Sequence, residues 1–484
     1  MAEAGGQGFA YDEVAYPTPI VPEMNPARIR AACAFYGYAP PAIEGAAVLE
    51  VGCGDGYNLL GIAAASPAAP HVGFDLSAAA IARGQKVLDA SGLANVELAE
   101  GDITDWRAGR TFDYILCHGV HSWVPPHVQD ALLTLIAAHL SPGGVTYLSH
   151  DVLPAAAPKQ AIKSFLRHVI PRQTAPHDAI AAARAVLSDF GAHQLPHSRL
   201  KPQFDVLLRE LPSFEDGYFF HDWLSEAYHP TSMLDLAASA GRAGLVPIAD
   251  AGLADLFDDG NGAAADGVAQ KLGGSHAARA YARDMMAGTR MFRRTILARA
   301  DAPPPDSPGL GELRFALAAA QESQAGGAIY RGADNAFYRP ASAIERHVMG
   351  RLASVAPREM TYAELLAEAR DPSALTRVLT QICAVPVANA YAAPAPFIER
   401  PGERPRASQL VRAMLDAAEF APTLRLNRLV SKQGATRIFL SLCDGTRTRE
   451  DLQRDMSASL GRDVPPAQIE AVLADLAARQ VFLA

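Results

Sequence analysis

Short apolar runs alternate with helical patterns along the first 150 residues of the chain. Residues 78–90 and 128–140 space their apolar side chains as one face of a helix requires. The strand, helix, strand order predicts an α/β fold with a parallel, doubly wound sheet, because a crossover segment must connect strands that run in the same direction. Ligands of such sheets bind at the carboxyl ends of the strands. The expected strands lie at residues 48–51, 73–75, 96–103, 112–118 and 145–148.

The pattern changes beyond residue 154. Residues 155–210 are mainly helical, with interrupting prolines and no clear strand, and we interpret residues 155–230 as a helical insertion. Strand signals return at residues 244–249 and 290–299, which would complete a sheet of seven strands with the last strand antiparallel. The glycine- and alanine-rich residues 258–275 between them predict a loop.

Two proline-rich stretches, residues 300–311 and 393–408, divide the remainder of the chain. Helical patterns between them, followed by a short strand, indicate a middle domain. Beyond them, a helix through Ser441, a turn, a helix capped by Thr448, a last helix and a short strand are typical of a winged helix. The expected domains are residues 1–154 together with 231–299, residues 155–230, residues 312–392 and residues 407–484.

Composition narrows the class of protein. A chain of 484 residues exceeds what one hydrophobic core usually serves. The net charge of −9 argues against a nucleic-acid surface, because phosphate binding requires a concentrated positive field. Five scattered cysteines are typical of reduced thiols. Because no signal peptide or membrane-spanning run is evident, we expect a cytoplasmic protein without membrane insertion.

A glycine-rich loop with neighbouring acids carries the strongest chemical signal. Residues 48–56 read Val-Leu-Glu-Val-Gly-Cys-Gly-Asp-Gly, and Asp75 ends the next strand. Bare backbone lets a nucleoside approach closely, and a carboxylate accepts hydrogen bonds from both ribose hydroxyls. A dinucleotide site requires a small residue where Tyr57 stands, so we predict S-adenosylmethionine rather than NAD. The expected cofactor-binding residues at these two strand ends are Glu50, Gly52, Cys53, Gly54, Gly56, Asp75 and Leu76.

Two later strand ends would complete the cofactor site. Asp102 would accept a hydrogen bond from the adenine amino group while Ile103 packs on the ring, and His118 would contact the cofactor through its backbone. His118 and His121 also stand where a base or an orienting hydrogen bond would be useful. We expect no metal site at this pair, because a third ligand is lacking.

Several strings together resemble a known family. They are Tyr11-Asp12, Tyr16-Pro17, residues 48–56, His118-Gly119-Val120-His121-Ser122-Trp123-Val124-Pro125, Phe292-Arg293-Arg294-Thr295 and Asp444-Gly445-Thr446-Arg447-Thr448. The combination is similar to bacterial class I methyltransferases with a methyltransferase regulatory domain, a group that includes rickettsial outer-membrane-protein lysine methyltransferases. The resemblance implies a Rossmann-like, seven-stranded methyltransferase sheet with a helical insertion for dimerisation or as a lid. A middle regulatory domain and a winged-helix-like domain, both smaller and mainly helical, would follow.

Methyl acceptor and cofactor should meet beyond the fourth and fifth strands. The candidate catalytic residues are His118, His121 and Asp151, and the candidate substrate-binding residues are Tyr11, Tyr16 and Trp123. An aromatic ring face attracts a cation, and a carboxylate holds one. Structural alternatives exist, with His121 as a loop residue, Trp123 as a packing anchor and Asp151 as a helix N-cap.

These observations predict methyl transfer from S-adenosylmethionine by direct displacement, for which the protein supplies alignment and excludes water. The expected acceptor is a lysine or another amine of a protein, and the expected assembly is a homodimer. Methylation of an oxygen or nitrogen on a small molecule is one alternative. A regulatory protein that binds the cofactor without turnover is another. Nucleic acid is disfavoured as the acceptor, because the Asn/Asp-Pro-Pro-Tyr/Phe tetrad of base amino methylation is replaced by Cys-His-Gly-Val at residues 117–120.

Overall fold

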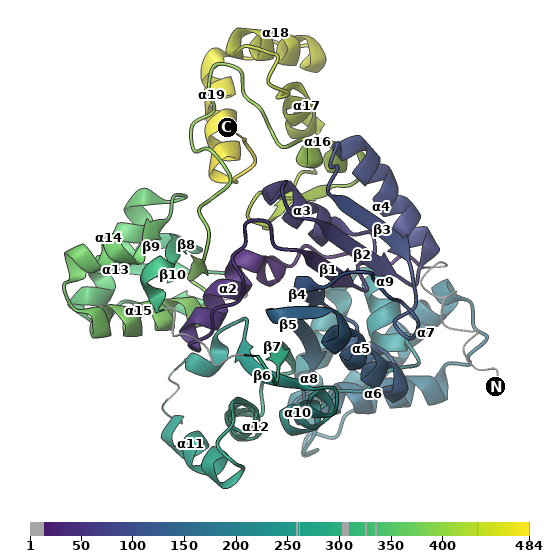
Figure 1. Ribbon diagram of the computed structural model, residues 1–484. Helices are drawn as coiled ribbons and strands as arrows, with labels where there is room; N and C mark the ends of the chain where they lie inside the picture. Colours follow the sequence, from purple (N-terminus) through teal and green to yellow (C-terminus); the bar gives the residue numbers. More distant parts are fainter. Residues whose placement is uncertain are drawn as a thin grey trace.

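A seven-stranded sheet forms the centre of the molecule in the computed structural model, which describes residues 14–257, 260, 262–302, 309–324, 327–333, 336–432 and 434–483 (Figure 1). The strands are β1 (Val48–Val51), β2 (His71–Asp75), β3 (Val96–Glu100), β4 (Phe112–Cys117), β5 (Leu140–Asp151), β6 (Leu245–Asp250) and β7 (Phe292–Arg299). Their spatial order is β3-β2-β1-β4-β5-β7-β6, and β7 runs antiparallel to both β5 and β6. The predicted Rossmann-like sheet with an antiparallel seventh strand is confirmed.

Both faces of the sheet are buried, which explains why its central strands lack polar alternation. Val48, Leu116 and Tyr147 belong to the core on one face, and Leu49, Ile115 and Leu297 to the core on the other. Helices on the first face are α2 (Pro26–Phe35), α3 (Tyr57–Ala65) and α4 (Ala78–Ser91). Helices on the second face are α5 (Pro126–His139), α10 (Met233–Arg242) and α12 (His276–Ala287). The strand order reverses between β1 and β4, so a ligand crevice is expected at their carboxyl ends.

The segment between β5 and β6 is helical, as the sequence predicts. Besides α10 and the short turn η3 (Leu211–Ser213), its helices are α6 (Ala157–Val169), α7 (Pro176–Ala192), α8 (Lys201–Glu210), α9 (Asp216–Phe219) and the π-helical turn η4 (Phe220–Leu224). They enclose a small core of their own around Leu166, Phe219 and Trp223. In the described ranges, no helix has the length and apolar composition needed to cross a bilayer.

One local prediction is wrong. The glycine- and alanine-rich residues 258–275 were expected to form a loop, but Gly262–Lys271 form helix α11. Alanine is the best helix former, and Ala265 and Ala269 are buried four residues apart on one face of α11. Residues 258, 259 and 261 lie outside the described part of the chain.

Two small antiparallel sheets and three helices follow β7. Strand β8 (Arg314–Leu317) lies between β12 (Met360–Thr361) and β13 (Ala388–Tyr391). Strands β9 (Ala320–Gln324), β10 (Gly327–Arg331) and β11 (Phe337–Tyr338) form the second sheet. The predicted helices are present as α13 (Ala343–Val355), α14 (Tyr362–Ala369) and α15 (Pro372–Ala384).

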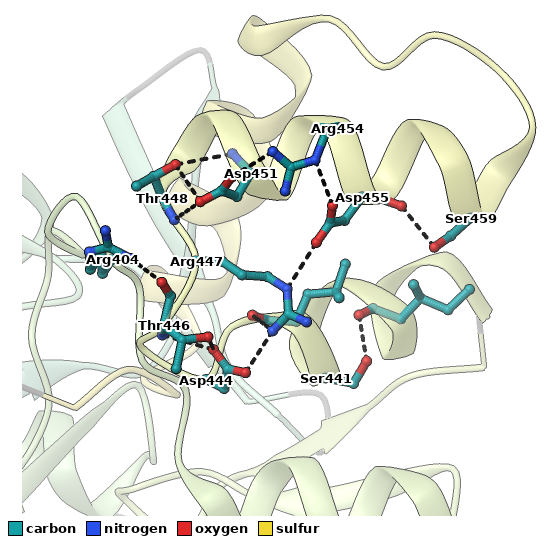
Figure 2. A network of polar contacts seen from close by, with 12 residues as sticks. Arg404, Ser441, Asp444, Thr446, Arg447, Thr448, Asp451, Arg454, Asp455 and Ser459 are labelled. Carbon is teal, nitrogen blue, oxygen red and sulfur yellow. Dashed lines mark hydrogen bonds and ion pairs between the residues drawn. The ribbon is translucent and has the colours of Figure 1, made fainter.

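The last part of the chain divides into two pieces. Helix α16 (Gln409–Ala417) and the hairpin β14 (Phe420–Pro422) and β15 (Arg428–Val430) pack against α4 and α3 of the central domain. Helices α17 (Gly434–Leu442), α18 (Arg449–Leu460) and α19 (Pro466–Ala478) extend beyond them (Figure 1). The predicted cap of α18 is present, since Thr448 and Asp451 form a reciprocal capping box (Figure 2).

Candidate functional site

The loop after β1 has a backbone that only glycine adopts readily. Gly52, Gly54 and Gly56 have φ angles of 69°, 55° and 72°. A Cβ atom added at Gly52 would lie 2.5 Å from Cγ2 of Val120, which follows β4. The loop therefore lies against the end of β4, and only bare backbone fits between the two strand ends.

Asp75 connects this loop to the next helix. Its Oδ2 atom accepts a hydrogen bond from the Gly54 N–H at 2.8 Å, and its Oδ1 atom accepts one from the Ser77 N–H at 2.9 Å. The adjacent Leu76 side chain is 55% exposed. An oriented carboxylate beside an exposed apolar side chain suits a sugar and the flat base attached to it.

Glu50 is a buried acid with an unused oxygen. Its side chain is 4% exposed, and Oε2 has no hydrogen-bond partner among the described residues. Burial raises the pKa of Glu50 to about 8, and the nearby Asp75 carboxylate also raises it. An orphaned carboxyl oxygen next to the glycine loop fits a cofactor that carries an ammonium group. Cys53 differs, because its side chain is buried against Gly73 of β2 and only its backbone faces the loop.

Asp102 and Ile103 follow β3. The Asp102 carboxylate accepts hydrogen bonds from the backbone N–H and the hydroxyl of Thr104, both at 2.8 Å, and is exposed. Ile103 is partly buried against the core of the second sheet face. Asp102 thus stabilises its own turn, and the adenine contact of Asp102 and Ile103 stays a prediction.

His118 and His121 face different surroundings. His118 Nδ1 lies 3.0 Å from the Tyr147 hydroxyl, and its ring contacts the edge of Phe292. His121 is 1% exposed and packs edge-on against His150. Burial lowers the pKa of both His118 and His121 to about 4, so both rings are neutral at pH 7. The two residues are therefore not arranged as a pair, and His121 lies beneath the loop rather than at its surface.

Asp151 ends β5 inside a buried ionic cluster. Its Oδ2 atom accepts a hydrogen bond from the Tyr228 hydroxyl at 2.6 Å and lies 3.4 Å from the Lys159 ammonium. Lys159 also donates to Asp222 at 2.7 Å. The N-cap of α6 is Ala156, so the alternative of Asp151 as a helix cap is wrong.

Trp123 contributes a ring face to the same cluster. The Nζ atoms of Lys159 and Lys163 lie 4.7 and 4.8 Å from its ring centroid, and Tyr228 contacts both ammonium groups as well. Lys163 is fully buried and donates to the Asp222 carbonyl and the Ser225 hydroxyl. We call Asp151, Trp123, Tyr228, Asp222, Lys159 and Lys163 the lysine cage.

The lysine cage contains residues that the sequence reasoning missed. Lys159 and Lys163 stand four residues apart on α6, on the same helix face as the buried Ile162 and Leu166. Charged residues on an apolar helix face were the available signal, because a buried lysine requires partners. Asp222 and Tyr228 gave no such signal, since their partners are distant in the sequence.

Tyr16 lies in a segment that joins the insertion to the glycine loop. Its ring contacts Tyr218 and His221, while the Val14 carbonyl accepts a hydrogen bond from His221. Farther along, the Thr18 hydroxyl lies 3.4 Å from the Asp55 N–H. Tyr11, the other N-terminal candidate, lies outside the described residues.

Within the part of the chain that the structure describes, no three His, Cys, Asp or Glu side chains are grouped so that they could hold a metal ion.

Comparison with known proteins agrees with this geometry. A model for a methyltransferase domain matches residues 48–144, and a model for a predicted methyltransferase regulatory domain matches residues 215–299. A protein of Rickettsia prowazekii is 32% identical over 222 residues, which are 45% of this chain and 88% of that protein. A second protein of that organism is 33% identical over 251 residues, 51% of this chain and 45% of the relative. The chain belongs to the class I methyltransferases that carry a methyltransferase regulatory domain.

A solved structure shares the whole fold of this methyltransferase. PKMT2 from Rickettsia typhi, in complex with AdoHcy, has a TM-score of 0.80 and 20% identity. The match covers 97% of this methyltransferase and 100% of PKMT2. The chain is thus an S-adenosylmethionine-dependent methyltransferase, and the strands and loop predicted from sequence are those of its cofactor fold.

The regulatory match begins in the insertion of the methyltransferase and ends at β7. Residues 215–299 include η4, β6, α12 and β7, so this segment completes the central sheet. Residues 312–392, which we expected to be the regulatory domain, lie outside the match.

Proposed function

We propose that this methyltransferase transfers a methyl group to a lysine, or another amine, of a protein. The lysine cage is the observation that supports this most directly, because its acidic and aromatic groups already hold two lysine ammonium groups at the carboxyl ends of β4 and β5. Groups with this chemistry suit an incoming amine on the same edge of the sheet.

A lysine acceptor must bind as a cation and react as a neutral amine. Burial opposes the charge of Lys159, but Asp222 and Asp151 outweigh it and raise the pKa of that residue. Lys163 behaves in the opposite way, since burial lowers its pKa to about 7. The lysine cage therefore combines two effects. Carboxylates favour the protonated form of Lys159, and burial favours the neutral form of Lys163. A substrate amine would need the same combination before it attacks a methyl group.

The cofactor residues have complementary roles in this proposal. S-adenosylmethionine, when bound, supplies a methyl group that is activated by its sulfonium. The loop of Gly52, Gly54 and Gly56 approaches the nucleoside, Asp75 accepts from the ribose hydroxyls, and Glu50 faces the cofactor ammonium. Leu76, Ile103 and Asp102 border the adenine, and Trp123 with Tyr16 lines the route for the acceptor.

The surface of the C-terminal helices supports a protein acceptor over nucleic acid. Arg447 pairs with Asp444 and Asp455, and Arg454 pairs with Asp451 and Asp455 (Figure 2). These arginines are neutralised by neighbouring acids, so they give no concentrated positive field for phosphates.

We also propose a homodimer formed through the insertion, in a cytoplasmic protein. Several large apolar side chains of the insertion are exposed on α6, on α8 and in the connection between α7 and α8. A second subunit would cover them and remove them from water. They are Phe165, Val169, Leu195, Leu200 and Val206.

The test of the acceptor uses purified protein, methyl-labelled S-adenosylmethionine and a cell lysate. We expect label in protein, recovered as methylated lysine after acid hydrolysis. Asp151→Asn should reduce the label at least tenfold, because the cage loses a charge-assisted contact worth about 1.5–3 kcal/mol. Asp301→Asn removes a carboxylate from an exposed pair with Arg299 and serves as the matched control. Label only in small molecules, or none despite AdoHcy binding, would contradict the proposal.

A further inference from the structure

A line of four polar side chains crosses one face of the sheet. His118 follows β4, Tyr147 lies on β5 and Arg294 on β7, and strand pairing puts all three on the same face. Tyr147 is fully buried, and its hydroxyl lies 3.0 Å from Nδ1 of His118. The positive charge of Arg294 acts on the Tyr147 hydroxyl and favours its loss of a proton, and the Arg294 Nε atom lies 4.0 Å from Glu23 Oε2. The buried Tyr147 hydroxyl thus lies between His118 and the ion pair of Arg294 with Glu23.

The direction of the hydrogen bond between Tyr147 and His118 follows from which groups can donate. A guanidinium only donates, so the nearby Arg294 cannot take the Tyr147 hydroxyl proton. A buried hydroxyl proton needs an acceptor, and among the described residues Nδ1 of His118 is the acceptor within hydrogen-bond distance of the Tyr147 oxygen, so Nδ1 accepts this proton. A neutral imidazole that accepts at Nδ1 carries its proton on Nε2.

We propose that Tyr147 is a positioning residue, which fixes His118 as the Nε2–H tautomer so that this histidine donates a hydrogen bond to an oxygen of the bound cofactor or methyl acceptor. The inference rests on methyltransferase activity and not on a lysine acceptor. It changes the role expected of His118, because an imidazole whose Nε2 is protonated is a donor and not a general base at the mouth of the site.

The charges around His118 favour the same state. Burial lowers the pKa of His118 to about 4, and Arg294 lowers it further while Glu23 opposes this. Burial also raises the pKa of Tyr147 far above its ordinary value, so the hydroxyl keeps its proton. Among the described residues, the charged or titratable groups that face His118 are Tyr147, Arg294 and Glu23. No change of tautomer is therefore expected between pH 6 and pH 8.

The position of His118 indicates which groups could accept a hydrogen bond from its Nε2–H. His118 directly follows Cys117, whose strand partner Val51 leads into the glycine loop. Two oxygen acceptors can occur there, the carboxylate on the amino-acid part of the cofactor and an oxygen of the substrate. Both present the same chemistry, a lone pair that accepts an N–H bond.

The decisive test reads the tautomer directly by ¹⁵N NMR of the full-length protein labelled at histidine. We expect a pyridine-like Nδ1 and a pyrrole-like Nε2 for His118 from pH 6 to pH 8, assigned by loss of the signals in His118→Gln. Tyr147→Phe should shift His118 toward a mixture of tautomers. Tyr114→Phe is the matched control, because it removes another buried hydroxyl from the same face, one that donates to Pro41. A protonated Nδ1 in the wild type, or an unchanged spectrum in Tyr147→Phe, would overturn the proposal.

Calorimetry then identifies the acceptor oxygen. If His118 donates to the cofactor carboxylate, Tyr147→Phe should weaken AdoHcy binding in proportion to the lost Nε2–H tautomer, about twofold for an equal mixture. Binding of 5′-methylthioadenosine, which lacks the amino-acid part, should not change. If the oxygen belongs to the substrate, both ligands should bind as in the wild type and only methyl transfer into lysate should fall. A similar loss for both ligands would contradict a directed hydrogen bond and indicate a distorted site.

Discussion

The carboxylate of Asp75 is oriented by the chain itself, because the backbone N–H groups of Gly54 and Ser77 donate to its two oxygens. An acceptor fixed in this way should contribute strongly to ribose binding. We expect Asp75→Ala to weaken AdoHcy binding by about 1.5–3 kcal/mol, the range for hydrogen bonds to a charged group. Isothermal calorimetry measures the loss, and Asp89→Ala on the exposed side of α4 should bind normally. Unchanged affinity in Asp75→Ala would mean that the ribose binds elsewhere.

Glu50 predicts a proton exchange during cofactor binding. Burial and the Asp75 carboxylate raise its pKa from 4.5 to about 8, so the free protein holds Glu50 mainly protonated at pH 7. Because of this raised pKa, the free energy of unfolding of the cofactor-free protein should decrease as the pH rises from 4.5 through 8. A cofactor ammonium beside Oε2 would favour the ionised form and lower the pKa again.

AdoHcy binding at pH 7 should therefore release about one proton, and affinity should increase as the pH rises toward 8. Calorimetry in buffers of different ionisation enthalpy counts the proton. Glu50→Gln is the control, because it cannot ionise and should reduce the count to zero. Proton release that persists in Glu50→Gln would refute this assignment.

Single residues differed in how far the sequence could predict them. The glycine loop and Asp75 are local patterns, since the chemistry needs them at fixed distances along the chain. Tyr147 and Asp222 gain their roles only from partners on other elements, 29 and 63 residues away. The sequence predicts Asp151 as a substrate contact, and in the structure its side-chain partners are Lys159 and Tyr228 of the chain itself.

At the scale of elements, helix α6 places the amine of Lys163 in a buried position that opposes its positive charge. Lys163 has a pKa of about 7, below its value of 10.5 in water, so the fold favours the neutral amine. The cost of keeping the proton is fully present below about pH 7 and disappears as the pH rises toward 10.5. Lys163→Met removes this cost, together with two hydrogen bonds whose loss does not depend on pH in the same way.

The melting temperature of Lys163→Met relative to wild type should therefore increase as the pH is lowered from about 10 to 6. Scanning calorimetry or thermal fluorescence measures this slope. Lys201→Met on the more exposed α8, which removes a lysine paired with Asp205, is the matched control. A flat profile for Lys163→Met would show that Lys163 is charged without cost.

The elements that sequence patterns predicted well are those with a clear apolar period. The buried strands of the central sheet and the capped helix α18 are of this kind. Strand β9 was missed because its sequence, Ala-Gln-Glu-Ser-Gln, has no apolar alternation and is held by pairing with β10. Helix α11 was missed because glycine and alanine together suggested a loop, although tertiary packing decides between the two.

At the scale of the whole molecule, segments from both ends of the chain contact the cofactor domain. The N-terminal segment passes from His221 of the insertion to the loop near Asp55. At the other end, Gln409 of α16 donates to the Ala90 carbonyl at the end of α4, and Phe420 packs edge-on against Tyr57 of α3. Neither contact could be predicted from patterns, because no local signal joins residues so far apart. Both segments reach elements that form the cofactor site, so binding and overall assembly should be coupled.

Gly61 offers a test of this coupling. It lies within α3, and an added Cβ atom would come within 2.6 Å of Leu426 and 2.8 Å of Pro422 in the C-terminal segment. Alanine normally stabilises a helix interior by about 1 kcal/mol relative to glycine. Gly61→Ala should instead destabilise the protein by about 1–3 kcal/mol, the usual cost of overpacking.

AdoHcy affinity should also fall in Gly61→Ala, because Gly56 of the glycine loop is the N-cap of α3. Gly350→Ala is the matched control, since Gly350 lies within α13 with no atom near its added Cβ, and it should raise stability. Denaturant unfolding and calorimetry measure both effects. A Gly61→Ala protein that is as stable as Gly350→Ala and binds AdoHcy normally would show that the C-terminal segment yields easily, and that its contact with α3 does not support the cofactor site.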